Sequence, residues 1–137
     1  MAKDFWLNLP VKDINKSKAF FTQLGFKFNT QYPDPRSACL LVGEKNVVVM
    51  LFEEPAFKGF ISGDIADAQQ GAEVLLSFDA QSKEEVDEIA NKAVAAGGKT
   101  NHKPKEMQGW MYGCVFTDID GHRWNVLHMD MSKMPKQ

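Results

Sequence analysis

Cysteine is scarce in this chain of 137 residues, which contains only Cys39 and Cys114. The two lie far apart and neither belongs to a C-x-x-C pair, so the sequence offers no disulfide framework, cysteine-based zinc site or thioredoxin-like motif. We expect both cysteines to be free, buried thiols in a reducing compartment, which places the protein in the cytoplasm.

Long apolar runs and an excess of basic residues are also missing. No segment approaches the roughly 20 apolar residues of a membrane span, and the first residues lack the apolar region of a signal peptide. Lysine and arginine number 16 against 18 aspartates and glutamates, a formal net charge of -2, without the basic patch of a nucleic-acid-binding protein. We therefore expect neither a membrane nor a nucleic acid as a partner.

Motifs of several common enzyme classes are absent. The sequence contains no H-E-x-x-H zinc motif and no G-x-S-x-G nucleophile elbow. Gly97-Gly98 follows a predicted helix, which is typical of a helix end rather than of a phosphate-binding loop. The segment 118–121 resembles part of a calcium loop, but an EF-hand would need a glutamate where Leu127 stands, so we interpret it as a tight turn. The histidines stand singly, at His102, His122 and His128.

The elements that can be predicted follow one order twice. In the first half, alternating apolar residues predict a strand at 5–11. Asp13 is a suitable N-cap for a helix whose apolar face includes Ile14 and Phe21, and Gly25 suits the end of that helix. Three further strands are predicted at 26–29, 37–42 and 46–52.

The same order returns after residue 70. Ser82 and Glu85 form a capping box before a helix that carries Val86 and Ala90 on its apolar face and ends at Gly97-Gly98. The strands of this half are predicted at 73–78, 99–102, 110–117 and 123–129. The segment 53–70 between the halves is predicted to be a connector with a short helix at 64–69.

This order predicts an α+β fold within one domain that spans residues 1–137. Its parts are a first module at about 1–53, a linker at about 54–70, a second module at about 71–131 and a short C-terminal tail. The hydrophobic fraction of 44% is ordinary for a globular protein and allows a core to form.

Aromatic strand residues and one glutamate are the candidates for a binding site. If the sheet curls, Trp6, Trp110 and Tyr112 line its concave side; the alternative is that each of them fills the core. Glu73 opens an apolar strand, where it is either solvated or turned into a cavity. In the second case desolvation would raise the pKa of Glu73 and make it a general base.

Five short segments carry a resemblance. The chain opens with LPVKD at 9–13, SKAFF at 17–21 and LGF at 24–26, continues with AAGG at 95–98 and closes with DIDGHRW at 118–124. In this order and spacing they resemble the vicinal-oxygen-chelate superfamily, the group of glyoxalases, bleomycin-resistance proteins and extradiol dioxygenases. The resemblance covers nearly the whole chain. It implies two tandem βαβββ modules that form a curved, cup-shaped mixed sheet, and a homodimer with cavities near the subunit interface.

The resemblance also implies where a metal would be held. The family's enzymes use four strand side chains, which fall here on Trp6, Met50, Glu73 and Asn125, or on Asn8 in place of Trp6 if the register slips by two. Only Glu73 is a usual ligand, because tryptophan is a donor, the thioether is soft and the amide oxygen is neutral. We therefore expect no cofactor; a divalent metal would require Glu73 and Asn125 to gain further ligands.

These observations predict a metal-free protein that binds a flat or aromatic small molecule in the sheet cavity. An alternative is a glyoxalase-like lyase or isomerase, or an extradiol-dioxygenase-like enzyme, with Glu73 as base or ligand. A third interpretation is an interaction domain with a vestigial cavity. The candidate ligand-binding residues are Trp6, Asn8, Met50, Phe52, Trp110, Tyr112 and Asn125.

Overall fold

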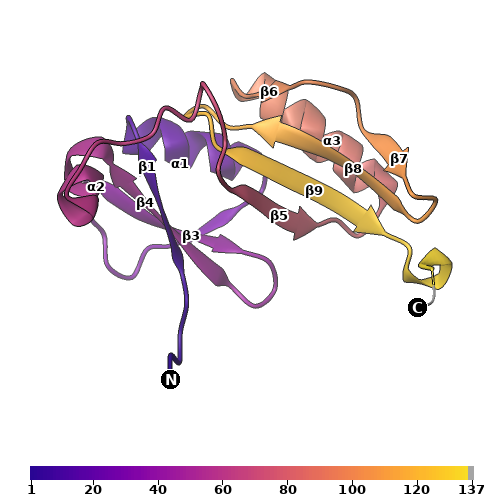
Figure 1. Cartoon of the computed structure of the whole chain (residues 1–137), viewed down its shortest axis with the longest axis horizontal. Helices are drawn as coiled ribbons and strands as arrows, with labels where there is room; N and C mark the ends of the chain where they lie inside the picture. The colour runs from indigo at the N-terminus through magenta and orange to yellow at the C-terminus, as the bar shows by residue number, and fades with distance from the viewer. Residues whose placement is uncertain (136–137) are drawn as a thin grey trace. The chain divides into compact units, whose positions relative to one another are not determined.

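In each half of the chain a strand is followed by a helix and further strands, three in the first half as the sequence predicts and four in the second (Figure 1). The structure, a computed structural model, describes residues 1–135, so the last two residues of the predicted tail lie outside the described part. The chain divides into two compact units, Met1–Ala68 and Gln69–Gln137. The division falls near the end of the predicted linker, and the α+β class with mixed sheets is confirmed.

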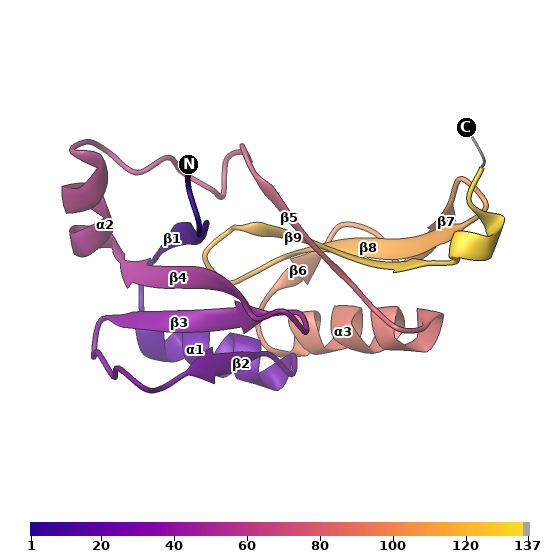
Figure 2. The same ribbon diagram turned by 90° about the horizontal axis from the view of Figure 1, so that it is seen from below.

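The first unit is a four-stranded mixed sheet with the strand order β1-β4-β3-β2. Strand β1 runs parallel to β4, because helix α1 carries the chain across the sheet, and the other pairs are antiparallel. Figure 2 shows α1 against one face of this sheet. The elements are β1 (Leu7–Val11), α1 (Ile14–Gln23), β2 (Lys27–Asn29), β3 (Ser37–Val42) and β4 (Val47–Glu53).

Apolar alternation decides which face of this sheet is buried. Leu9 and Val11 of β1 and Val49 and Leu51 of β4 are buried, whereas the residues between them are half-buried or exposed. Asp13 starts α1 as predicted, since its carboxylate accepts the backbone N–H groups of Asn15 and Lys16 at 3.0 and 3.2 Å. The opposite face of the sheet carries the alternate side chains, and we call it the open face.

The second unit repeats this topology with one extra strand. Its sheet has the order β5-β9-β8-β6, with β7 also paired to β8, and β5 runs parallel to β9. Helix α3 packs on one face, where Val86, Ala90, Cys114 and Val126 form a buried cluster. The elements are β5 (Leu75–Asp79), α3 (Lys83–Ala95), β6 (Lys99–Thr100), β7 (Lys105–Met107), β8 (Met111–Thr117), β9 (Arg123–Met129) and the 3₁₀ helix η1 (Met131–Lys133).

The capping box at the start of α3 is confirmed with one change. Ser82 Oγ accepts the backbone N–H of Glu85 at 3.1 Å. Glu85, however, accepts the backbone N–H of Gln81 at 3.3 Å, one residue before the cap. The side chain therefore satisfies a neighbouring donor at the same helix end.

The connector contains a helix, but in a different place from the one predicted. Helix α2 spans Glu54–Ile61, with a proline in its first turn, and Ser62 follows in the left-handed conformation at φ 52°; 64–69 is not helical. Proline fits the first helical turn because it lacks only an N–H that would have no helical partner there. The predicted helix at 64–69 is therefore wrong, and the connector's helix begins ten residues earlier.

The first residues of three strands, and the number of strands in the second unit, also differ from the prediction. Trp6 lies before β1, Glu73 two residues before β5, and Trp110 just before β8. Strand β7 is an addition: Lys105–Met107 pairs with β8 through a hairpin whose Gln108 and Gly109 have φ of 55° and 77°. Apolar alternation continues past the hydrogen-bonded ladder at strand ends, so sequence patterns overestimate strand length.

The two cysteines differ in burial. Cys114 is buried as predicted, and burial raises the pKa of its thiol, but Cys39 is only half-buried. Cys39 lies on the open face of its sheet, which is why it is less covered than expected.

Within residues 1–135, no helix is both long and apolar enough to cross a membrane.

Candidate functional site

A row of four side chains crosses the open face of the first unit. The strand register pairs Asn8 with Met50, Met50 with Cys39, and Cys39 with Asn29, so one residue comes from each strand. Register partners project from the same face of a sheet and lie on strands about 4.8 Å apart. The row therefore has one carboxamide at each end, with a thioether and a thiol between them.

A second row lies beside the first. Pro10, Phe52 and Ser37 are register partners on β1, β4 and β3. The Phe52 ring meets Phe60 of α2 edge-to-face, with the ring centroids 5.0 Å apart. Helix α2 thus contacts the open face, on the side of the sheet opposite α1 (Figure 2).

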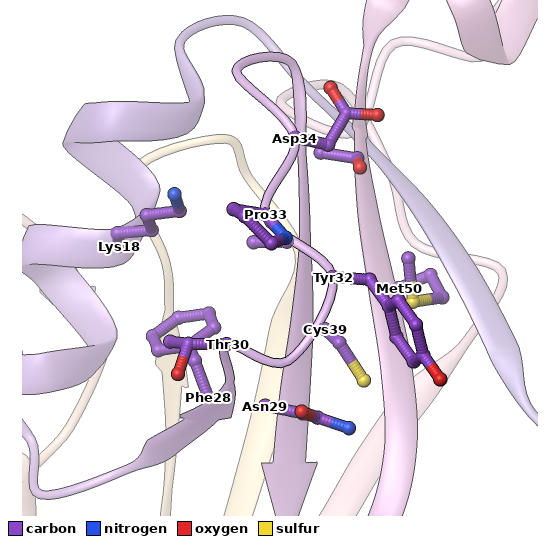
Figure 3. A pocket seen from close by; sticks show the side chains of 11 residues that line it. Lys18, Phe28, Asn29, Thr30, Tyr32, Pro33, Asp34, Cys39 and Met50 are labelled. Carbon is purple, nitrogen blue, oxygen red and sulfur yellow. The ribbon is translucent and has the colours of Figure 1, made fainter.

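A cavity of about 230 Å³ opens where the loop between β2 and β3 passes beside the two rows (Figure 3). The loop is folded by two side chains: Asn29 accepts the backbone N–H of Gln31 at 2.9 Å, and Asp34 accepts that of Arg36 at 2.8 Å. Of the candidate residues from the sequence, only Met50 lines this cavity. The full lining is Lys18, Phe28, Asn29, Thr30, Tyr32, Pro33, Asp34, Ser37, Ala38, Cys39 and Met50.

The side chains around the cavity differ in chemistry. Figure 3 shows Cys39 and Asn29 pointing to the same side from β3 and the end of β2, and Lys18 reaching from α1 toward Pro33. Lys18 and Asp34 are the charged lining residues. By the strand register Phe28 and Ala38 lie on the face covered by α1, whereas Cys39 and Met50 lie on the open face. The cavity lining therefore combines apolar and sulfur-containing residues from both faces of the sheet with one ammonium and one carboxylate.

The second unit positions its candidate residues differently. Asn125 of β9 is half-buried on the face away from α3, and its amide nitrogen donates to Ser77 Oγ at 3.2 Å. Glu73 is exposed and stands outside β5. Of the two environments that the sequence left open for Glu73, the unit places it in the solvated one.

Tyr112 lies on the opposite face of this sheet from Asn125. Val115 is the register partner of Asn125, and Tyr112 is three residues away on the same strand, so it faces α3. Its hydroxyl donates to Asp87 Oδ1 at 2.6 Å. This hydrogen bond, with partial burial and the negative charge of Asp87, raises the pKa of Tyr112 to about 12.

Tyr112 should therefore ionise far above the usual range for tyrosine. Because its folded-state pKa lies above the ordinary 10.0, the contact stabilises the fold below pH 10 and is lost as the pH rises toward 12. The tyrosinate absorbance of a Tyr32→Phe variant measures Tyr112 alone. Asp87→Asn should shift that titration downward; an unshifted titration would show that Asp87 is not the cause.

Trp110 has a different environment. Its indole N–H is buried and meets no acceptor among residues 1–135. With Tyr112 and His128 it lines a hollow of about 50 Å³. That volume holds no more than a few water molecules, so the second unit does not by itself offer Trp110 a cavity for a flat ligand.

The positions carried over for a metal do not form a suitable ligand set. Trp6 is 53% exposed and its only polar group is a donor, while Met50 offers a soft thioether. Glu73 and Asn125 supply one carboxylate and one amide oxygen. Across residues 1–135, no three His, Cys, Asp or Glu side chains are grouped closely enough to hold an ion. This donor set does not fit a divalent cation that prefers oxygen or nitrogen ligands.

The closing DIDGHRW motif forms a turn whose N–H groups bind one buried carboxylate, that of Asp118. Asp118 is 5% exposed; its Oδ1 accepts the backbone N–H groups of Asp120 and His122 at 2.9 and 3.0 Å, and its Oδ2 accepts the Trp124 indole N–H at 3.0 Å. Gly121 adopts φ 94° within this turn, which glycine permits. The predicted tight turn is confirmed, and its residues have a structural role.

Most residues that line the cavity could not be recognised from the sequence. Lys18 lies one residue beyond Ser17, which faces the core at 0% exposure, and nothing in the helical pattern distinguishes Lys18 from Lys16, the exposed lysine of the same helix. Tyr32 and Asp34 lie between the predicted strands at 26–29 and 37–42, in a segment for which the sequence indicates no site. The one usable signal was alternation on β3, which places Ser37 and Cys39 on the same face as Met50.

Comparisons with known proteins agree with this architecture. Residues 5–126 match the model of the glyoxalase/bleomycin resistance protein/dioxygenase superfamily. A hypothetical protein from S. aureus, SA1046, is 34% identical, with a TM-score of 0.83 over 93% of this chain and 95% of that one. The comparison with curated proteins found no match.

More distant structures share the fold. A glyoxalase/bleomycin resistance protein/dioxygenase family enzyme from Burkholderia phytofirmans PsJN is 23% identical, with a TM-score of 0.76 over 90% of this chain and 96% of that one. The fosfomycin resistance protein FosX from Listeria monocytogenes, complexed with Mn(II) and sulfate, is 21% identical, with a TM-score of 0.69 over 96% and 94%. Because the family model spans most of the sequence, this chain belongs to the glyoxalase/bleomycin resistance protein/dioxygenase superfamily.

Proposed function

We propose that this protein binds a flat or aromatic small molecule in the cavity of its first unit, and that binding requires no metal ion. The observation that carries the proposal is the cavity of about 230 Å³ beside the Asn8–Met50–Cys39–Asn29 row. Ligand pockets combine apolar walls with a few placed polar groups, and this lining has both.

The chemistry of the lining favours a ring. Phe28 and Tyr32 supply aromatic surface, and Met50 supplies a polarisable thioether that makes favourable contacts with aromatic rings. The carboxamide of Asn29, which lies at one end of the row and lines the cavity, can hydrogen-bond a polar substituent of the ligand. The FosX structure holds Mn(II) and sulfate, whereas the lining of this cavity offers aromatic surface, sulfur atoms and one carboxamide.

Filling the cavity tests the proposal. Ser37→Phe introduces a ring at a residue that lines the cavity, whereas Leu41→Phe introduces the same ring on the same strand and face, outside the cavity lining. Calorimetric titration with a panel of aromatic compounds should show binding to the wild type and to Leu41→Phe but not to Ser37→Phe. Equal binding by both variants, or a panel without any ligand, would contradict the proposal.

Metal addition is expected to leave this protein unchanged. The carried-over positions contribute only one carboxylate and one amide oxygen, so Mn²⁺ or Zn²⁺ has too few ligands to bind tightly. Protein as isolated should contain metal well below one equivalent, and Mn²⁺ should shift neither its thermal midpoint nor its ligand affinity. A metal-dependent stabilisation that Glu73→Gln abolishes would instead support the enzyme interpretation.

A further inference from the structure

We infer that the ligand of this cavity is a small carboxylic acid with an apolar body, and that Lys18 binds its carboxylate. The inference rests on the proposed function, because it names the chemistry of the ligand at the same site. It concerns a residue that the metal positions of the family do not include. Three properties of the cavity support it.

The first property is the position of Lys18. It is half-buried on α1 and lines the cavity, with its side chain directed toward Pro33 (Figure 3). No ion pair joins Lys18 to a carboxylate anywhere in residues 1–135. A half-buried lysine without a counter-ion gains from an anion that arrives with the ligand.

The second property is the arrangement of the other charge. Asp34 is the only acidic residue in the lining, and its Oδ1 already accepts the Arg36 backbone N–H at 2.8 Å within the loop. Its negative charge opposes a second anionic group on the ligand. The pair of charges therefore favours a monoanion over a phosphate or a dicarboxylate.

The third property is the apolar remainder of the wall. Phe28, Ala38, Cys39 and Met50 present little that could bind a charged group. A cavity of roughly 150 Å³ accepts benzene, so about 230 Å³ leaves room for one ring with a short acidic side chain. The ammonium of an amine of the same shape would be repelled by the Lys18 ammonium, and an alcohol would leave the charge of Lys18 without a counter-ion.

Three probes that share a ring separate these cases: phenylacetate, 2-phenylethanol and 2-phenylethylamine. We expect phenylacetate to bind about ten-fold more tightly than the alcohol, the effect of one charge-assisted contact at a partly exposed site, and the amine to bind most weakly. Lys18→Met keeps the length and apolar stem of the side chain but removes the charge. It should abolish the preference for the acid while leaving the affinity for the alcohol unchanged.

Lys16→Met is the matched control, because Lys16 is an exposed lysine of the same helix and does not line the cavity. It should retain the full preference for phenylacetate. The rate of Cys39 modification by a thiol reagent reports the location of binding, since Cys39 lines the cavity while Cys114 is buried in the other unit. Phenylacetate should slow this reaction in the wild type.

The outcomes distinguish the inference from the proposed function. Equal affinity for acid and alcohol, or an unchanged preference in Lys18→Met, would overturn the assignment of Lys18 and leave an aromatic binding site in place. Binding of phenylacetate without protection of Cys39 would place the acid elsewhere and also overturn it. If neither these probes nor the wider aromatic panel bound or protected Cys39, both conclusions would fail.

Discussion

Replacing Gly113 with alanine is expected to lower the free energy of unfolding by about 3 kcal/mol, an effect at the upper end for overpacking a sheet. A Cβ at this position of β8 would lie 2.5 Å from Leu127 Cδ2 and 2.6 Å from the carbonyl oxygen of Val126. The leucine can move, but the carbonyl belongs to the β8–β9 ladder. Chemical denaturation monitored by circular dichroism measures the loss.

Two further variants make this prediction specific. Gly59→Ala is the control, because nothing lies within 4 Å of a Cβ built on this residue of α2, and alanine favours a helix; it should leave stability unchanged or slightly increased. Leu127→Ala in the Gly113→Ala background should recover only part of the loss, since the carbonyl contact remains. A Gly113→Ala protein as stable as the wild type would show that the two strands separate easily here.

Replacing Asp118 with alanine is expected to cost about 3–4 kcal/mol. The substitution leaves two backbone N–H groups and the Trp124 indole N–H without their carboxylate acceptor, and a buried donor without an acceptor costs roughly 1–3 kcal/mol. Trp124 is 1% exposed, so water does not readily replace the carboxylate. The midpoint of chemical denaturation and the emission of Trp124 should both change.

Asparagine at position 118 separates the contributions. Asp118→Asn keeps one oxygen that can accept the backbone N–H groups of Asp120 and His122, but its amide places a donor against the Trp124 N–H. Its cost should therefore be smaller than that of alanine, and smaller again when Trp124→Phe has already removed the indole donor. Equal costs in both backgrounds would show that the Asp118–Trp124 bond contributes nothing.

Burial raises the pKa of the Asp118 carboxyl even though three N–H groups bind it. A folded-state pKa above the unfolded value means that the native protein binds its proton more tightly. The contribution of Asp118 to the free energy of unfolding therefore decreases as the pH rises from the ordinary range of aspartate, near 3.8, through the raised value. At neutral pH the role of the buried Asp118 side chain is to accept the N–H groups that hold the turn together.

The structure gives the family signature and the candidate binding site different roles. The closing motif forms the turn, while the cavity is formed by the loop of 30–36 and the first residues of β3 together with Lys18, the end of β2 and Met50. Relatives with the same closing motif can therefore differ in ligand, because function depends on the side chains of the site and not on the fold.

Neighbouring residues were enough to predict the local elements of this protein. Asp13 and Ser82 cap their helices as predicted, and the bounds of β3 and β9 match the predicted strands, because caps and apolar alternation are set by neighbouring residues. The repeated order of elements fixed the α+β class in the same way.

Which side chains meet at the cavity depends on contacts between distant parts of the folded chain. The cavity joins Lys18 of α1, the turn at Tyr32 and Asp34, and Met50 of β4, which are separated by up to 32 positions in the chain and come together through strand register and loop folding. The opposite faces of Asn125 and Tyr112 follow from register as well. Long-range contacts of this kind depend on where strands begin and pair, and apolar patterns leave those ends undetermined by a few residues.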